Sequence, residues 1–194
     1  MQSEELAHVV LSTDDEEIAD YGRSCGVSVP FIRPSCLAED ETLMVVVVQH
    51  AVRWLQNEDG YEADAVMLLQ PTSPLRRSSH IDEAIRCFRE YDTDGVISVS
   101  TPREHPYDYV TFSDGKMQRA VKRQAEGSRR QDWPEFFFVN GAIYLIRTST
   151  LLEKDTLVPG RSVPYLMEQA DSLDIDSAFD LQLASCLLES SGRA

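Results

Sequence analysis

The stretch AVMLLQPTSPLR, residues 65–76, joins an apolar run to a loop that holds two prolines and ends in arginine. The apolar run predicts a buried strand at 65–70. Proline fixes its own φ angle and restricts the residue before it, so the two prolines hold the loop in extended or turn geometry. Gln70, Thr72 and Ser73 therefore present hydrogen-bond donors and acceptors at low entropic cost, as expected of a ligand site in an α/β protein.

On both sides of this stretch, strand and helix patterns alternate along the chain. The expected strands lie at 8–12, 28–32, 65–70, 95–100 and 138–146, and the expected helices at 14–25, 42–57, 79–90 and 177–189. Such alternation is typical of an α/β domain built on a mainly parallel sheet. The 194 residues are enough for one sizeable core, so we expect a single domain over 1–194.

Residues 101–135 interrupt the alternation with several prolines and glycines between short extended pieces. This composition predicts a small β-rich excursion inserted between strands of the main sheet.

The charge and composition of the chain exclude some classes of protein. A net charge of -15 argues against a general nucleic-acid binder, although Mg²⁺ can bridge carboxylates to the phosphates of a nucleotide. No apolar run approaches the roughly 20 residues of a membrane span, so no membrane partner is expected. The four cysteines lack metal-binding spacing, which favours buried thiols in a reducing cytoplasm.

Asp174 and Asp176 are the best candidates for catalysis. Carboxylates two residues apart in an extended segment face the same side and lie close enough to share one divalent cation. The alternative is that Asp176 caps the helix expected to start near Ser177.

Two other side chains are placed to bind a polar ligand. The amide of Gln70, at the end of an apolar strand, offers two donors and an acceptor to sugar hydroxyls or an N-acyl group. Arg33 precedes a proline after a predicted strand and can point into a cleft, or it can pair with Glu39 or Asp40.

Two further positions have both a ligand-binding and a structural interpretation. Arg130 ends a basic island with Arg119, Lys122, Arg123 and Arg129, which suits a carboxylate or a phosphate but also a solvated loop. The segment from Asn140 to Tyr144 holds two small residues, which indicates that a sugar ring or a helix packs closely against the strand.

Taken together, five motifs resemble those of the acylneuraminate cytidylyltransferases, the CMP-sialic acid synthetases and their relatives acting on legionaminate and pseudaminate. They are LSTDDEEIA (11–19), FIRPSCLAED (31–40), LLQPTSPLR (68–76), VNGAIY (139–144) and DSLDID (171–176). The resemblance implies a three-layer, Rossmann-like fold of the nucleotide-diphospho-sugar transferase type. It also implies transfer of CMP from CTP to a nine-carbon 2-keto sugar acid with release of pyrophosphate, and a homodimer formed through the excursion at 101–135.

The resemblance gives roles to individual residues. Asp174 and Asp176 match the segment that binds Mg²⁺, and Arg33 matches an arginine associated with the nucleotide. Gln70, Arg130, Asn140 and Tyr144 match positions that line the sugar-acid site.

One part of the family pattern is missing from the sequence. Family members begin with a strand and a glycine- and lysine-rich loop around the nucleotide phosphates, and residues 1–194 lack this unit. The chain therefore resembles an N-terminally truncated member. Two alternatives stay open: a non-catalytic homologue that folds and binds a sugar acid, and a cytidylyltransferase for the eight-carbon sugar acid of lipopolysaccharide.

Overall fold

The computed structural model describes residues 3–122 and 129–190. The chain forms two compact units. The first unit comprises Met1–Gln70, Arg77–Ile97 and Ile143–Tyr165, and the second comprises Pro71–Arg76, Ser98–Ala142 and Leu166–Ala194.

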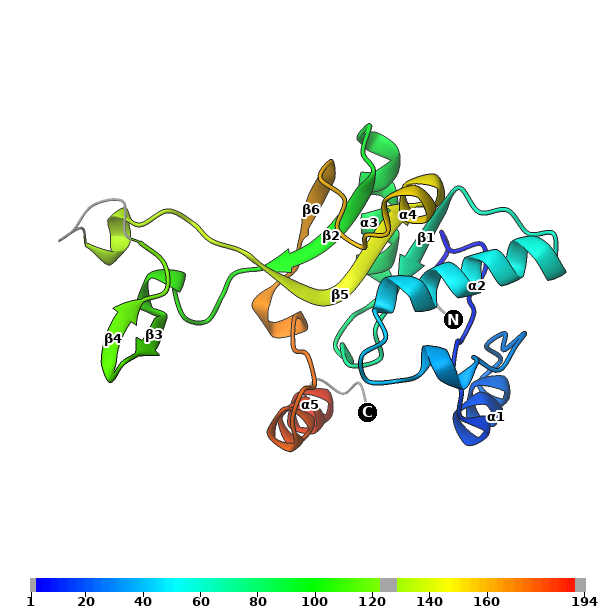
Figure 1. Ribbon diagram of the computed structural model, residues 1–194, viewed down its shortest axis with the longest axis horizontal. Coiled ribbons are helices and arrows are strands. Elements are labelled where there is room, and N and C mark those ends of the chain that lie inside the picture. The colour runs from blue at the N-terminus through cyan, green and yellow to red at the C-terminus, as the bar shows by residue number, and fades with distance from the viewer. Residues whose placement is uncertain (1–2, 123–128, 191–194) are drawn as a thin grey trace. The chain divides into compact units, whose positions relative to one another are not determined.

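Helices and strands alternate over much of the chain, which confirms the α/β class (Figure 1). The helices are α1 (Glu16–Ser24), α2 (Met44–Glu58), α3 (Ser78–Glu90), α4 (Thr148–Lys154) and α5 (Ala178–Ser190), with short 3-10 turns η1 (Ser35–Leu37), η2 (Pro106–Asp108), η3 (Arg130–Asp132) and η4 (Gln169–Asp171). The strands are β1 (Ala65–Leu68), β2 (Gly95–Ser100), β3 (Val110–Ser113), β4 (Lys116–Arg119), β5 (Phe138–Arg147) and β6 (Ser162–Leu166).

Four of the strands form one sheet in the order β1-β5-β2-β6. β1 pairs antiparallel with β5, and Leu68 at the end of β1 lies opposite Tyr144. The sheet is therefore antiparallel at this edge, and its first pair joins segments almost 80 residues apart in the sequence.

The strands expected at 8–12 and 28–32 are shorter than predicted. They meet as an isolated parallel bridge between Val10 and Ser28, and the Leu11 amide donates to the Ser28 carbonyl. Pro30 has no amide hydrogen, so the ladder cannot continue regularly past it. The sequence pattern also missed α4 and β6, since α4 spans only about two turns and β6 contains Pro164.

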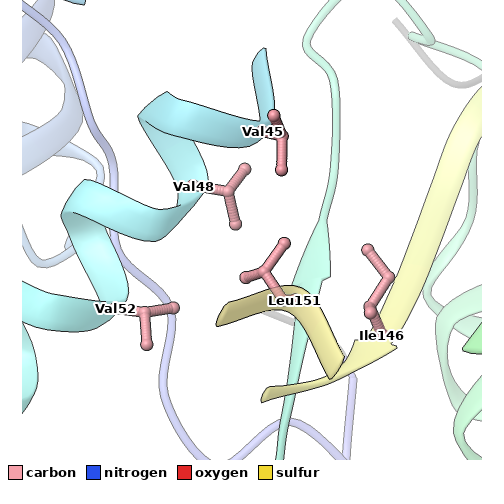
Figure 2. Close-up of a cluster of buried hydrophobic side chains, with 5 residues drawn as sticks. All are labelled: Val45, Val48, Val52, Ile146 and Leu151. Carbon is pink, nitrogen blue, oxygen red and sulfur yellow. The ribbon is translucent and has the colours of Figure 1, made fainter. Parts of the chain in front are cut away.

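The core of the first unit lies between α2, α4 and β5 (Figure 2). Val45, Val48 and Val52 recur at helical spacing on one face of α2 and point toward Ile146 and Leu151. Periodic valines on one face of a helix are the pattern expected for burial against a sheet. The tyrosine ring of Tyr144 packs against the same cluster.

A buried glutamine ties α2 to α4. The amide nitrogen Nε2 of Gln49 donates to the carbonyl of Leu151 at 2.8 Å and to Oδ1 of Asp155 at 2.7 Å. Gln49 is 4% exposed, and Asp155 ends α4 in the left-handed conformation. The glutamine therefore satisfies the carbonyl of the buried Leu151 and a side-chain oxygen of Asp155 at the end of a short helix.

Replacing Gln49 with methionine is expected to lower the free energy of unfolding by about 1–3 kcal/mol, because it leaves the Leu151 carbonyl without its donor. Urea unfolding followed by circular dichroism measures the change. Arg53→Met, at an exposed position one turn later in α2, is the matched control and should change stability by less than about 0.5 kcal/mol. Equal effects of the two substitutions would show that the Gln49 bonds contribute nothing.

Within the second unit, the β-rich excursion contains an antiparallel hairpin of β3 and β4 (Figure 1). It also contains a cluster of aromatic side chains. Tyr107 is 3% exposed and contacts the rings of His105, Trp133 and Phe136. His105 accepts a hydrogen bond from the Tyr107 amide at Nδ1, so its Nε2 carries the proton donated to the Pro134 carbonyl. Its role here is structural.

The cysteines differ in one respect from the expectation. All four are free thiols, but Cys25, Cys36 and Cys186 are exposed and Cys87 is half-buried. Cys25 follows the last turn of α1 and Cys186 lies on a helix of which only Ala184 is buried, so neither position offers a core to enter. Among residues 3–122 and 129–190, no helix is long and apolar enough to cross a membrane.

Candidate functional site

The second unit brings two of the sequence motifs together. The backbone amide of Ile175 donates to the carbonyl of Thr72 at 2.9 Å, which joins the DSLDID segment to the proline loop. On the same loop, Nη1 of Arg76 donates to the carbonyl of Ala142 at 2.9 Å, and burial lowers the pKa of Arg76. The loop is thus held both to the aspartate segment and to β5.

Asp174 lies next to this junction and has one oxygen that no group in the described part of the chain satisfies. Its Oδ1 is buried and lacks a hydrogen-bond partner among the described residues, as does the hydroxyl of Ser73. A buried carboxylate oxygen without a donor is costly unless a cation or a proton-donating ligand reaches it. Asp174 therefore fits the oxygen ligand that Mg²⁺ prefers.

No group of three or more His, Cys, Asp or Glu side chains gathers around a common point in the part of the chain that the structure describes. Within these residues there is thus no four-ligand cluster of the kind that holds structural zinc. Mg²⁺ is commonly held by one or two carboxylates together with substrate phosphates and water.

Asp176 does not cap the last helix. The cap is Ser177, whose hydroxyl accepts from the Asp180 amide at 3.3 Å and donates to Oδ2 of Asp180 at 2.6 Å. This reciprocal pairing leaves the Asp176 side chain exposed and outside the cap. The alternative interpretation of Asp176 as a capping residue is therefore wrong, and Asp176 keeps its place as a candidate ligand.

Asn140 lies in β5 and is 2% exposed. Its Oδ1 accepts from the hydroxyl of Ser98 at 2.5 Å and from the amide of Ala142 at 3.2 Å. Its Nδ2 donates to the hydroxyl of Ser172 at 2.9 Å and to Sδ of Met167 at 3.5 Å. Protein groups thus occupy all four hydrogen-bonding positions of this side chain.

The small residue Gly141 has a local explanation. Its φ angle of 77° lies in the left-handed region that side chains disfavour, so glycine is required by the backbone there. A ligand that approaches the strand is not needed to explain it.

Arg33 belongs to the first unit and is paired differently from the expectation. Its Nη2 lies 3.0 Å from Oδ1 of Asp14, and its backbone amide donates to the Thr13 carbonyl at 2.8 Å. Neither Glu39 nor Asp40 is the partner in this ion pair. The Nε atom of Arg33 is buried and without a partner among the described residues, so the guanidinium retains a donor.

The hydrogen bond from Arg33 holds the pKa of Asp14 below the ordinary value for aspartate. Replacing Arg33 with glutamine is therefore expected to raise the pKa of Asp14, which NMR titration of its carboxyl carbon measures. Because the pKa is depressed in the folded chain, the stabilisation exists above the ordinary aspartate pKa and is lost as the pH falls through the depressed value. An unchanged titration of Asp14 in Arg33→Gln would contradict the pairing.

The remaining predicted site residues are divided between the units. Gln70 and Tyr144 lie in the first unit, at the end of β1 and in β5, and both are half-buried. Arg130 is exposed in η3 of the second unit, where the neighbouring Arg129 pairs with Asp132. Arg123 of the basic island lies outside the described residues.

Sequence reasoning missed several residues that shape this region. The cap formed by Ser177 and Asp180 has a recognisable S-x-x-D pattern and was open to detection. By contrast, Ser172 and the carbonyl of Thr72 become important only through contacts with distant segments, which no local pattern indicates.

Comparisons with known proteins identify the family of the chain. The family model described as "Cytidylyltransferase" matches residues 1–186. The chain is 28% identical to the post-translational flagellin modification protein B of Campylobacter coli over 185 residues, which cover 94% of this chain and 77% of that protein. It is 29% identical to the CMP-N,N'-diacetyllegionaminic acid synthase of Legionella pneumophila over 191 residues, covering 97% of this chain and 81% of the relative.

A third relative is much longer. The N-acylneuraminate cytidylyltransferase of Streptococcus agalactiae serotype V is 30% identical over 172 residues, which cover 89% of this chain but 40% of that protein. Among solved structures, CMP:2-keto-3-deoxy-manno-octonic acid synthetase complexed with CTP aligns with a TM-score of 0.68 at 14% identity, covering 98% of this chain and 84% of that one. This likeness confirms the nucleotidyltransferase-like fold.

Proposed function

The chain belongs to the cytidylyltransferase family, and we propose that it transfers CMP from CTP to a nine-carbon 2-keto sugar acid of the neuraminate, legionaminate or pseudaminate type. The observation that supports this proposal best is the buried, unpartnered Oδ1 of Asp174 on a segment bonded to the proline loop. Relatives whose names state sialic or legionaminic acid activation support the choice of substrate.

Asp174 and Asp176 would hold Mg²⁺, which when bound stabilises negative charge on the phosphate oxygens and on the leaving group. In the reaction, the anomeric hydroxyl oxygen bonds to the α-phosphorus of CTP while the bond from that phosphorus to the pyrophosphate oxygen breaks, and the hydroxyl proton is released. The two carboxylates would hold the cation in place before the reaction, at the position where negative charge develops on the phosphate oxygens.

We propose one contact for the nucleotide and three for the sugar acid. Gln70 offers amide donors and an acceptor to hydroxyl or N-acyl groups, Tyr144 its phenol, and Arg130 an exposed guanidinium to the carboxylate. Arg33, with its unsatisfied Nε, would contact the nucleotide. Asn140 matches the same sugar-binding set, but protein groups already saturate its amide, which supports a different role.

The excursion would form a homodimer. Val110, Phe112 and Met117 share one face of the β3–β4 hairpin, and all three are exposed. An isolated two-stranded hairpin is marginally stable in water, so an uncovered apolar face favours packing against a second copy. The free thiols fit a reducing cytoplasm, where we place the protein.

The proposed function is tested by incubating the chain with CTP and Mg²⁺ and each of four acids: N-acetylneuraminate, legionaminate, pseudaminate and the eight-carbon acid of lipopolysaccharide. Mass spectrometry identifies any CMP-sugar. We expect a product with at least one nine-carbon acid. A product with the eight-carbon acid alone would correct the substrate, and binding of a nine-carbon acid without product would identify a non-catalytic homologue.

A further inference from the structure

The segment that contains Asp174 is held on both sides of that residue. On one side, Ser172 is bonded to Asn140 through its hydroxyl, and on the other, Ile175 is bonded to Thr72 through its amide. Consecutive Cα atoms are about 3.8 Å apart, so a residue between two such anchors has little freedom to move. All these residues belong to the second unit.

The direction of every bond around Asn140 is fixed by its partners. The Ala142 amide can only donate, so the atom facing it is Oδ1 and the opposite atom, Nδ2, faces Ser172. Ser172 uses its own proton to reach the Glu168 carbonyl at 2.8 Å, so its hydroxyl accepts from Asn140. The network therefore has one arrangement, and it runs from β2 through β5 to the aspartate segment.

A further contact anchors the same segment at its N-terminal end. The amide of Met167 donates to the carbonyl of Val99 at 2.8 Å, and Met167 also contacts Nδ2 of Asn140 through its sulfur. The chain from Met167 to Ile175 is thus anchored at its start, at Ser172 and at its end. Asp174, with an oxygen that lacks a protein donor, is held by a framework whose own groups are largely satisfied.

We propose that Asn140 is a positioning residue, which acts through Ser172 to hold Asp174 in the geometry that receives a divalent cation. This role differs from contact with the sugar acid. It deepens the proposed function and rests on it for the identity of the reaction. A buried amide saturated by protein groups is suited to fixing a segment, whereas a sugar contact needs an amide with an unused donor or acceptor.

The test is Ser172→Ala, which removes the hydroxyl that joins Asn140 to the aspartate segment. The affinity for Mn²⁺ is measured in the presence of CTP, and the electron paramagnetic resonance signal reports the free Mn²⁺. We expect this affinity to fall about tenfold, as for the loss of one buried hydrogen bond. NMR hydrogen exchange of the Ile175 amide should accelerate by a similar factor. The KM for the sugar acid should stay within about twofold of the original, because no sugar contact is removed.

Ser98→Ala is the matched control. It removes a buried hydroxyl bonded to the same asparagine, but at Oδ1, which keeps the Ala142 amide. Mn²⁺ binding should then be unchanged. If both variants weaken Mn²⁺ binding equally, or if Ser172→Ala raises the KM for the sugar acid and leaves Mn²⁺ binding unchanged, the positioning role is wrong.

If Ser172→Ala does not fold, Ser172→Cys, whose thiol is a weak acceptor, is compared with Ser98→Ala in the same measurements. Mn²⁺ binding and hydrogen exchange are measured without any sugar acid. Absence of turnover with every sugar acid would therefore overturn the proposed function, while these two measurements still decide the role of Asn140.

Discussion

Replacing Asp174 with asparagine is expected to lower kcat about 10³-fold while the protein stays folded. Asparagine has nearly the same shape but removes the negative charge that would hold Mg²⁺ beside the phosphates. Loss of one group that stabilises developing charge typically costs a factor of about 10² to 10³. The buried Oδ1 of Asp174 makes no hydrogen bond to the described protein groups, so replacing the carboxylate breaks no such bond and removes little folding stability.

The measurement is steady-state turnover at saturating CTP and sugar acid, with circular dichroism to confirm the fold. Asp176→Asn should also lose Mg²⁺-dependent turnover. The control is Asp132→Asn, which removes an exposed carboxylate paired with Arg129 in the same unit and should leave kcat within about twofold. If Asp174→Asn keeps its turnover, Asp174 is not a ligand of the catalytic cation.

Phe112→Asp is expected to convert a dimer into a monomer. Phe112 is 78% exposed and lies opposite Met117, which is 68% exposed, on the apolar face of the β3–β4 hairpin. If this face packs against a second copy, a carboxylate there is buried without a partner, which costs several kcal/mol at each of the two symmetric positions. Dissociation should then be complete at micromolar protein concentration.

Sedimentation velocity of the original chain and the variant measures this change. Thr111→Asp is the matched control, because Thr111 lies on the opposite face of the same strand, across from Gln118. We expect it to leave the dimer intact. A monomer in the original chain, or dissociation by Thr111→Asp and not by Phe112→Asp, would place the interface elsewhere.

The sequence predicted the elements that depend on strong local periodicity. The valine pattern of α2, the apolar run of β1 and the long β5 strand all form near their expected bounds. The excursion contains a β hairpin as expected, and Gly115 supplies the positive φ angle of its tight turn. Predictions from weaker patterns were less accurate. The strands expected at 8–12 and 28–32 form only an isolated bridge, because Pro30 interrupts the pairing.

Partners that are distant in the sequence were beyond local reasoning. The pairing of Arg33 with Asp14 depends on how two segments meet, so the alternative ion pair with the nearby acids Glu39 or Asp40 was wrong. The small residues around Asn140 indicated close packing, and the observed reason is the left-handed backbone at Gly141. The bonds from Asn140 to Ser98 and Ser172 span more than 30 residues in each direction, which no spacing pattern indicates.

Release of pyrophosphate from CTP by the original chain with Mg²⁺ tests the central claim most directly. We predict that pyrophosphate appears with CTP and a nine-carbon 2-keto sugar acid together, in equal amount to the CMP-sugar formed, and that it is absent when either substrate or Mg²⁺ is withheld. A folded sample that releases no pyrophosphate with any of these acids would contradict the account.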